Sequence, residues 1–114
     1  MDQDAHMRRI IDNFSSDLNN LSSESKKKFP QVKESCEASL LKLRQINSLK
    51  INLFKAMCDS SPDLIKPLIM GCETKQSKII QICLNSVQKV IEAKILNIVR
   101  TNLNYFLIKL NKNY

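Results

Sequence analysis

The chain has 114 residues, of which 43% are hydrophobic and 25% charged, with one glycine and three prolines. A chain of this length forms one domain or part of one, and it can bury about two-thirds of its unfolded surface. So few glycines and prolines argue against disorder and against an all-β fold rich in turns, and the expected class is all-α.

The formal net charge is +7, and it is unevenly spread. Residues 1–24 carry a net −3, residues 25–73 a net +4 and residues 74–114 a net +6. A basic surface favours an anionic partner, which is a membrane, a nucleic acid or an acidic protein. Lysines on solvated helix faces produce the same composition, so the charge alone does not choose among these alternatives.

Two helices are predicted in the first half of the chain. Apolar residues three and four apart predict the first over residues 7–21, at Met7, Ile10, Ile11, Phe14, Leu18 and Leu21. Serines then weaken the pattern, and Pro30 suits the first turn of a second helix that reaches about Ile46. The apolar stripe changes phase at Asn47-Ser48, which indicates a kink or a short separate helix over residues 49–57.

The stretch CDSSPDLIKP, residues 58–67, has the pattern of a helix end followed by a new start. Ser60 or Ser61 is predicted as the N-cap and Pro62 as the first helical position, with the helix continuing to Ile69. Pro67 lies close enough to that start to remove at most one backbone hydrogen bond.

Gly71 and Cys72 are predicted to form the elbow between this helix and the next. A glycine in a left-handed or tight turn ends a helix at little cost, and Thr74 is available to cap a helix over residues 79–91. The two helices then form an antiparallel pair of the kind that stacks into α-solenoids. A reactive Cys72 beside a helix N-terminus is the alternative interpretation of the same residues.

The amino-acid composition changes after Lys94, where asparagine becomes frequent and acidic residues are absent. Ile95, Val99, Leu103, Phe106 and Leu110 still suit a helix, which brings the expected total to about five. Two domain segments are therefore expected: a helical domain over residues 1–94 and a divergent C-terminal helix or non-family tail over residues 95–114. A reading frame that runs past its coding sequence explains the change equally well, and would leave a helical solenoid incomplete.

The sequence shows little sign of catalytic or metal-binding chemistry. The four cysteines are 22, 14 and 11 residues apart, without the paired ligands of a zinc site, and His6 is the only histidine. Phosphate-binding loops and common hydrolase motifs are missing, so neither an enzyme nor a cofactor is expected. We expect a cytosolic chain with reduced, mostly buried thiols, because no secretory signal or bilayer-spanning run is present.

The sharpest basic cluster is KKKF, residues 26–29. Lys26, Lys27 and Lys28, with Lys33, are predicted to contact an anionic membrane or an acidic partner. A solvated corner between helices is an equally good interpretation. The cluster is short and has no interleaved aromatic residues, which argues against nucleic acid.

Two stretches together resemble a known family: SSESKKKFPQVKESCE and PLIMGCETKQSKIIQICLNSVQKVI. They are similar to the N-terminal dimerisation-and-cyclophilin-binding (DCB) domain of the Mon-two proteins, relatives of the large Arf guanine-nucleotide exchange factors. The similarity runs from about Arg8 to Lys94.

The resemblance implies a HEAT/armadillo-like helical domain at the head of a long, non-catalytic trafficking scaffold. It implies a cytoplasmic protein, peripheral on membranes of the Golgi, the trans-Golgi network and endosomes. The implied partners are Dopey-type proteins, Arf-like GTPases and a second copy of the domain. If the chain self-associates, the apolar stripe of residues 95–110, with Leu103 and Phe106, is the first surface to test.

Two other functions remain open at this stage. A small basic helical protein that binds nucleic acid would use the net charge of residues 25–114. A truncated product with little function of its own would follow from the change in composition at Lys94.

Overall fold

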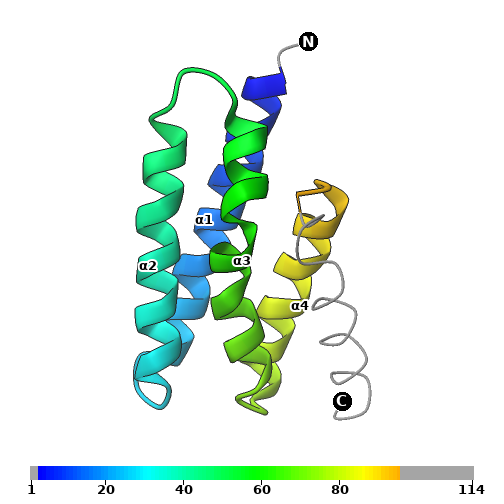
Figure 1. The fold of residues 1–114 in the computed structure, drawn as a ribbon. Helices are drawn as coiled ribbons and strands as arrows, with labels where there is room; N and C mark the ends of the chain where they lie inside the picture. Colours follow the sequence, from blue (N-terminus) through cyan, green and yellow to red (C-terminus); the bar gives the residue numbers. More distant parts are fainter. Residues whose placement is uncertain (1–2, 96–114) are drawn as a thin grey trace.

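The computed structural model describes residues 3–95, which form four helices and no strand. These are α1 (Gln3–Ser25), α2 (Pro30–Asn47), α3 (Leu53–Cys72) and α4 (Ser77–Glu92). Successive helices run antiparallel, and α3 lies in contact with each of the other three (Figure 1). The predicted all-α class and antiparallel helical pairs are confirmed. The fifth helix expected over residues 95–110 lies outside the described residues, apart from Ile95.

One hydrophobic core joins the four helices. Each apolar stripe predicted from the sequence turns inward, and α1 and α3 contribute to the centre of the core because each packs on the three other helices. Each fully buried aliphatic side chain contributes about 1.5–3 kcal/mol. The largest side chains with almost no exposure are Met7, Ile11, Leu18, Leu21, Leu43, Leu53, Met57, Leu64 and Leu68.

The start of α2 and its end agree with the sequence pattern. Pro30 is its first residue, where the missing N–H has no helical acceptor in any case. The phase change at Asn47-Ser48 coincides with the end of α2 and with a loop over residues 48–52. The short separate helix expected over residues 49–57 does not form, because residues 53–57 are the first turns of α3.

Arg8 of α1 fixes the loop between α2 and α3. Its guanidinium donates to the carbonyl oxygen of Asn47 at 2.6 Å, to Asn47 Oδ1 at 2.9 Å and to the carbonyl oxygen of Leu49 at 2.9 Å. Asn52, in the left-handed region at φ 63°, then reverses the chain into α3. A single planar side chain therefore satisfies carbonyl groups at the end of one helix and in the loop that follows.

The predicted helix break at Ser60-Ser61 is wrong. Residues 53–72 are one helix that runs through both Pro62 and Pro67. Ser61 is not an N-cap but a fully buried residue in the middle of α3. A proline inside a helix removes the hydrogen bond to the carbonyl four residues earlier, so Cys58 and Asp63 each lose a backbone donor.

Two serine hydroxyls replace the missing donors. Ser61 Oγ donates to the carbonyl oxygen of Cys58 at 2.8 Å, and Ser39 Oγ, from α2, donates to that of Asp63 at 3.2 Å. Both serines are buried, with at most 3% of their surface exposed. Each carbonyl orphaned by a proline is therefore satisfied, and α3 stays continuous because buried backbone groups retain partners.

We predict that Ser39→Ala and Ser61→Ala each lower the free energy of unfolding by about 1–2 kcal/mol, because each leaves a buried carbonyl without a donor. Ser60→Ala is the matched control, since Ser60 lies in the same helix and makes neither bond. It should be neutral or slightly stabilising. Urea denaturation followed by circular dichroism measures all three. Equal midpoints for the three variants would contradict this explanation of the unbroken helix.

Candidate functional site

The lysine cluster predicted from the sequence forms the loop between α1 and α2. Lys26, Lys27 and Lys28 are all exposed, and none forms an ion pair within the described residues. Phe29, the last residue of the KKKF motif, packs against the core. Its N–H donates to the carbonyl oxygen of Ser25 at 2.8 Å, so the loop is a short closed connection that holds three ammonium groups in solvent.

The turn between α3 and α4 brings further lysines to the same end of the bundle (Figure 1). Lys75 is exposed and adopts the left-handed conformation at φ 61°. Lys78, at the start of α4, forms an ion pair of 3.2 Å with Glu24 near the end of α1. This pair ties the two connections together, so residues 26–28 and Lys75 form one basic end of the molecule, which we call the lysine end.

Lys33 differs from the other three predicted lysines because its ammonium group is already in an ion pair. It lies in the first turns of α2 and is half-buried, with its ammonium paired to Glu37 one helical turn later. The hydrogen bond from Lys33 to the Glu37 carboxylate raises the pKa of Lys33. Lys33 therefore remains cationic but is already neutralised locally, whereas the three loop lysines are free to meet an anion.

Gly71 and Cys72 are the last two residues of α3, so they lie at the elbow, but not for the predicted reason. Gly71 is helical, and no glycine has a positive φ. Lys75 is the left-handed residue of the turn. Thr74 does not cap α4 as predicted; its hydroxyl instead donates to the carbonyl oxygen of Gly71 at 2.7 Å, at the end of α3.

Gly71 is required by the close approach of α4 rather than by its own conformation. A Cβ atom there would overlap Cys83 Sγ and lie 3.3 Å from Leu21 Cδ1. Helices α1, α3 and α4 therefore meet at this residue. The sequence contains no local signal for that contact, because its other members are 12 and 50 residues away.

Cys72 and Cys83 form a buried thiol pair beside Gly71. Cys72 is 7% exposed and Cys83 is fully buried. A hydrogen bond from the Cys83 thiol lowers the pKa of Cys72, and the same bond together with burial raises the pKa of Cys83. Burial raises the pKa of the Cys36 thiol to about 12. All four cysteines are free thiols.

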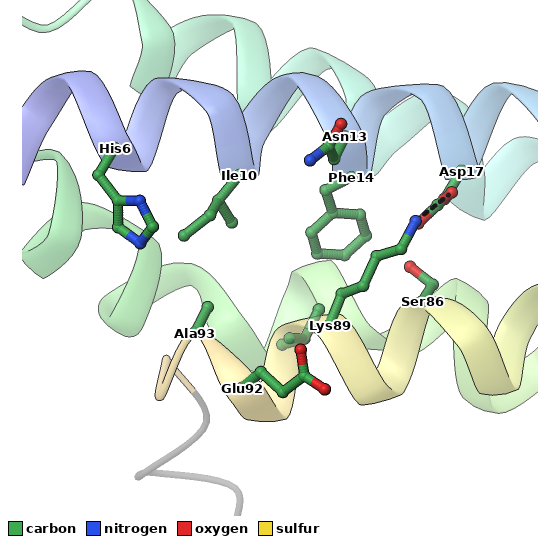
Figure 2. Close-up of a pocket in the computed structure, with 10 residues that line it drawn as sticks. His6, Ile10, Asn13, Phe14, Asp17, Ser86, Lys89, Glu92 and Ala93 are labelled. Atoms are coloured by element: carbon green, nitrogen blue, oxygen red, sulfur yellow. Dashed lines mark hydrogen bonds and ion pairs between the residues drawn. The ribbon is translucent and has the colours of Figure 1, made fainter.

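A groove of about 230 Å³ lies between α1 and α4 (Figure 2). Lys89 reaches across it to Asp17 at 3.3 Å. Ser86 is 1% exposed, and its Oγ has no hydrogen-bond partner within the described residues. His6 lies near the start of α1 and lines the same groove. No role was predicted for it from the sequence. The groove is lined by apolar side chains, among them Phe14 and Val90, and by polar ones.

Among the described residues, the exposed large apolar side chains are Leu41, Leu49, Ile51 and Ile91, and two of them lie at the end opposite the lysine end. Leu49 and Ile51, in the loop fixed by Arg8, are 41% and 68% exposed. They flank Lys50, which is also exposed. Both residues were expected in a kink or short helix over residues 49–57, whereas they lie in the loop before α3, and this is why their exposure was not predicted.

The described residues contain neither a metal site nor a helix that could span a membrane. Within residues 3–95 no group of three or more histidine, cysteine or acidic residues has a geometry that could hold a metal ion. None of the four described helices has the length and apolar character needed to cross a bilayer.

The chain is similar in sequence to a known protein family. Residues 5–112 match the model of the Mon2/Sec7/BIG1-like dimerisation and cyclophilin-binding domain. The chain is 36% identical over 91 residues to the Protein MON2 homolog of Xenopus laevis, and 36% identical over 95 residues to that of Drosophila melanogaster. It is 29% identical over 93 residues to Monensin-resistant homolog 2 of Caenorhabditis elegans. No solved structure matches.

These alignments cover 79–83% of this chain but only 5–6% of each relative. The chain therefore corresponds to a small part of the length of the proteins that it resembles. The family match continues beyond Lys94 to residue 112, and the division of the chain at Lys94 stays a prediction.

We predict that Gly71→Ala lowers the free energy of unfolding by about 1–3 kcal/mol, although alanine is the better helix former, because the new methyl group overlaps Cys83 Sγ in a packed core. The same change in a Cys83→Ala background should cost less, since the overlapping atom is gone. A double-mutant cycle by chemical denaturation measures the difference. If Gly71→Ala lowered the free energy of unfolding equally in both backgrounds, contact with Cys83 would not be the reason that residue 71 must be glycine.

Proposed function

Because the chain belongs to the family of Mon2/Sec7/BIG1-like dimerisation and cyclophilin-binding domains, we propose that it is a non-catalytic interaction module of protein traffic between endosomes and the Golgi. The observation that carries this proposal is the match of that family over residues 5–112, together with the similarity to MON2 homologues. The family is described by what it binds and not by a reaction, so the chain acts by holding partners.

The described helices suit this role. The core of α1–α4 is closed, and the loops at the two ends of the bundle carry exposed lysines at one end and the exposed Leu49 and Ile51 at the other. We propose that its partners are a second copy of the domain, a Dopey-type protein and Arf-like GTPases. We further propose that it works in the cytoplasm, peripherally on membranes of the Golgi, the trans-Golgi network and endosomes.

The lysine end is the part of the molecule that we assign to the anionic surface of these membranes. Three unpaired ammonium groups on one short loop, with Lys75 beside them, give a local positive field without a competing carboxylate in the loop itself. Each basic residue near an anionic bilayer contributes about 1 kcal/mol. Contact of this strength is reversible, so stable residence on a membrane needs further interactions by protein partners.

The trafficking proposal is tested by locating the chain in cells. A tagged chain should concentrate on endosomal and Golgi membranes, and it should capture proteins of those membranes. A tagged chain that stays evenly distributed in the cytosol and captures none of them would contradict the proposed role.

The assignment of the lysine end predicts a specific loss of vesicle binding. Replacing Lys26, Lys27 and Lys28 together with Gln should weaken binding to vesicles that contain phosphatidylserine by up to about a hundredfold, because three cationic contacts are lost. Binding of the unmodified chain should also fall as salt is raised. Flotation of vesicles with the bound chain measures both effects.

Lys33→Gln is the matched control, because this lysine is already paired with Glu37 and should contribute little. Vesicles of phosphatidylcholine alone should bind neither form. A loss with Lys33→Gln equal to that of the triple variant, or equal binding to neutral vesicles, would show that the loop is not the contact.

Self-association gives a second prediction. We expect the chain to form dimers, and Leu103→Asp with Phe106→Asp to abolish them, because these residues fall on the apolar stripe over residues 95–110. Leu49→Asp with Ile51→Asp is the matched control, since it removes exposed apolar surface at a different place. Sedimentation equilibrium measures the mass. A monomer at every concentration would contradict dimerisation, and dissociation by the control pair alone would move the interface to the loop.

A further inference from the structure

The elbow between α3 and α4 holds two thiols in contact for a structural reason. Gly71 has no side chain, and Cys83 Sγ occupies the space where its Cβ would be. Cys72, the next residue, accepts a hydrogen bond from the same Cys83 thiol. The missing side chain of Gly71 therefore allows a sulfur from α4 to reach the last turn of α3.

The four thiols differ in how readily they can ionise. Cys72 is the one whose pKa is lowered, because the Cys83 thiol donates to it. Burial raises the pKa of both Cys36 and Cys58. Since the thiolate is the nucleophile, Cys72 is the sulfur best prepared to react, and its neighbour is a second thiol.

We propose that Cys72 and Cys83 are a modification site, a thiol pair that hydrogen peroxide converts to a disulfide joining the end of α3 to the middle of α4. This goes beyond the proposed binding role and does not depend on it. The bond would close a loop over residues 72–83 around the elbow, and it would add a covalent link between the two helices.

The chemistry balances with hydrogen peroxide as the oxidant. The Cys72 thiolate attacks one peroxide oxygen, the O–O bond breaks, and Cys72 becomes a sulfenic acid while hydroxide leaves and takes up a proton. The Cys83 sulfur then attacks the Cys72 sulfur, its proton goes to the departing hydroxyl, and water leaves. Two thiols and one peroxide thus become one disulfide and two waters.

Access and geometry favour Cys72 as the first site. It is in the last turn of α3, where helix ends open locally at low free-energy cost, and 7% of its surface is already exposed. Cys83 has no exposed surface, so it is placed to resolve the sulfenic acid from inside the core. The alternatives are Cys58, which is more exposed, and Cys36, which is fully buried and close enough to Cys83 to raise its pKa.

The test is peroxide treatment of the folded chain, followed by blocking of free thiols under denaturing conditions and peptide mapping without reduction. The expected product is a Cys72–Cys83 linked peptide within one molecule, with Cys36 and Cys58 blocked as free thiols. A thiol reductant should reverse it, and the oxidised chain should melt at a higher temperature because the loop is closed. Free Cys72 and Cys83 beside an oxidised Cys58, or a link between two molecules, would overturn the proposal.

Variants separate the roles of the two sulfurs. Cys83→Ser should leave Cys72 as a sulfenic acid that dimedone traps, whereas Cys58→Ser should form the disulfide as the unmodified chain does. Equal dimedone labelling of Cys72 in the unmodified chain and in Cys83→Ser would show that Cys83 does not resolve it. Mapping of the unmodified chain decides the proposal even if a variant fails to fold.

Discussion

The fold depends on α3 remaining a single helix through two prolines. This helix packs against α1, α2 and α4, so a break within it would disturb its packing on all three neighbours. A proline in a helix interior costs about 3 kcal/mol or more when nothing compensates. Two buried hydroxyl groups compensate here, and one of them belongs to α2. The pairing of α2 with α3 is thus a hydrogen-bonding requirement as well as an apolar one.

Local patterns in the sequence predicted what depends on local physics. The apolar stripes predicted the faces of α1, α2 and α4, and Pro30 predicted the start of α2, because helical periodicity and proline geometry act within a few residues. The prediction was wrong at Ser60-Ser61. Serines before a proline are typical of a helix start, and only the distant Ser39 explains why α3 continues instead.

The elbow shows the same limit at the level of single residues. The sequence indicated that Gly71 matters, but the reason lies in Cys83 and Leu21, which meet it only in the folded chain. Lys33 was grouped with residues 26–28 because it is close in the sequence, whereas its pairing with Glu37 removes it from the free charges. Leu49 and Ile51 were expected in a kink or short helix over residues 49–57, and only the structure shows that they lie exposed in the loop that Arg8 contacts.

As an interaction module, the domain has different surfaces at its two ends. The lysine end offers charge, which acts at a distance and depends on salt, while the loop fixed by Arg8 offers two apolar side chains, which act only on contact. Both are supported by the same central helix, because α3 connects the loop at residues 48–52 with the turn at residues 73–76. A break in α3 would remove the continuous helix that connects these two surfaces.

The continuity of α3 is therefore the claim to test first, and backbone hydrogen exchange measured by NMR across residues 55–72 tests it directly. The account predicts slow exchange on both sides of Pro62 and Pro67, with the amides of residues 59–61 and 63–66 protected about as strongly as the rest of the helix interior. Fast exchange confined to residues 59–63, between two protected segments, would show two separate helices and contradict the account.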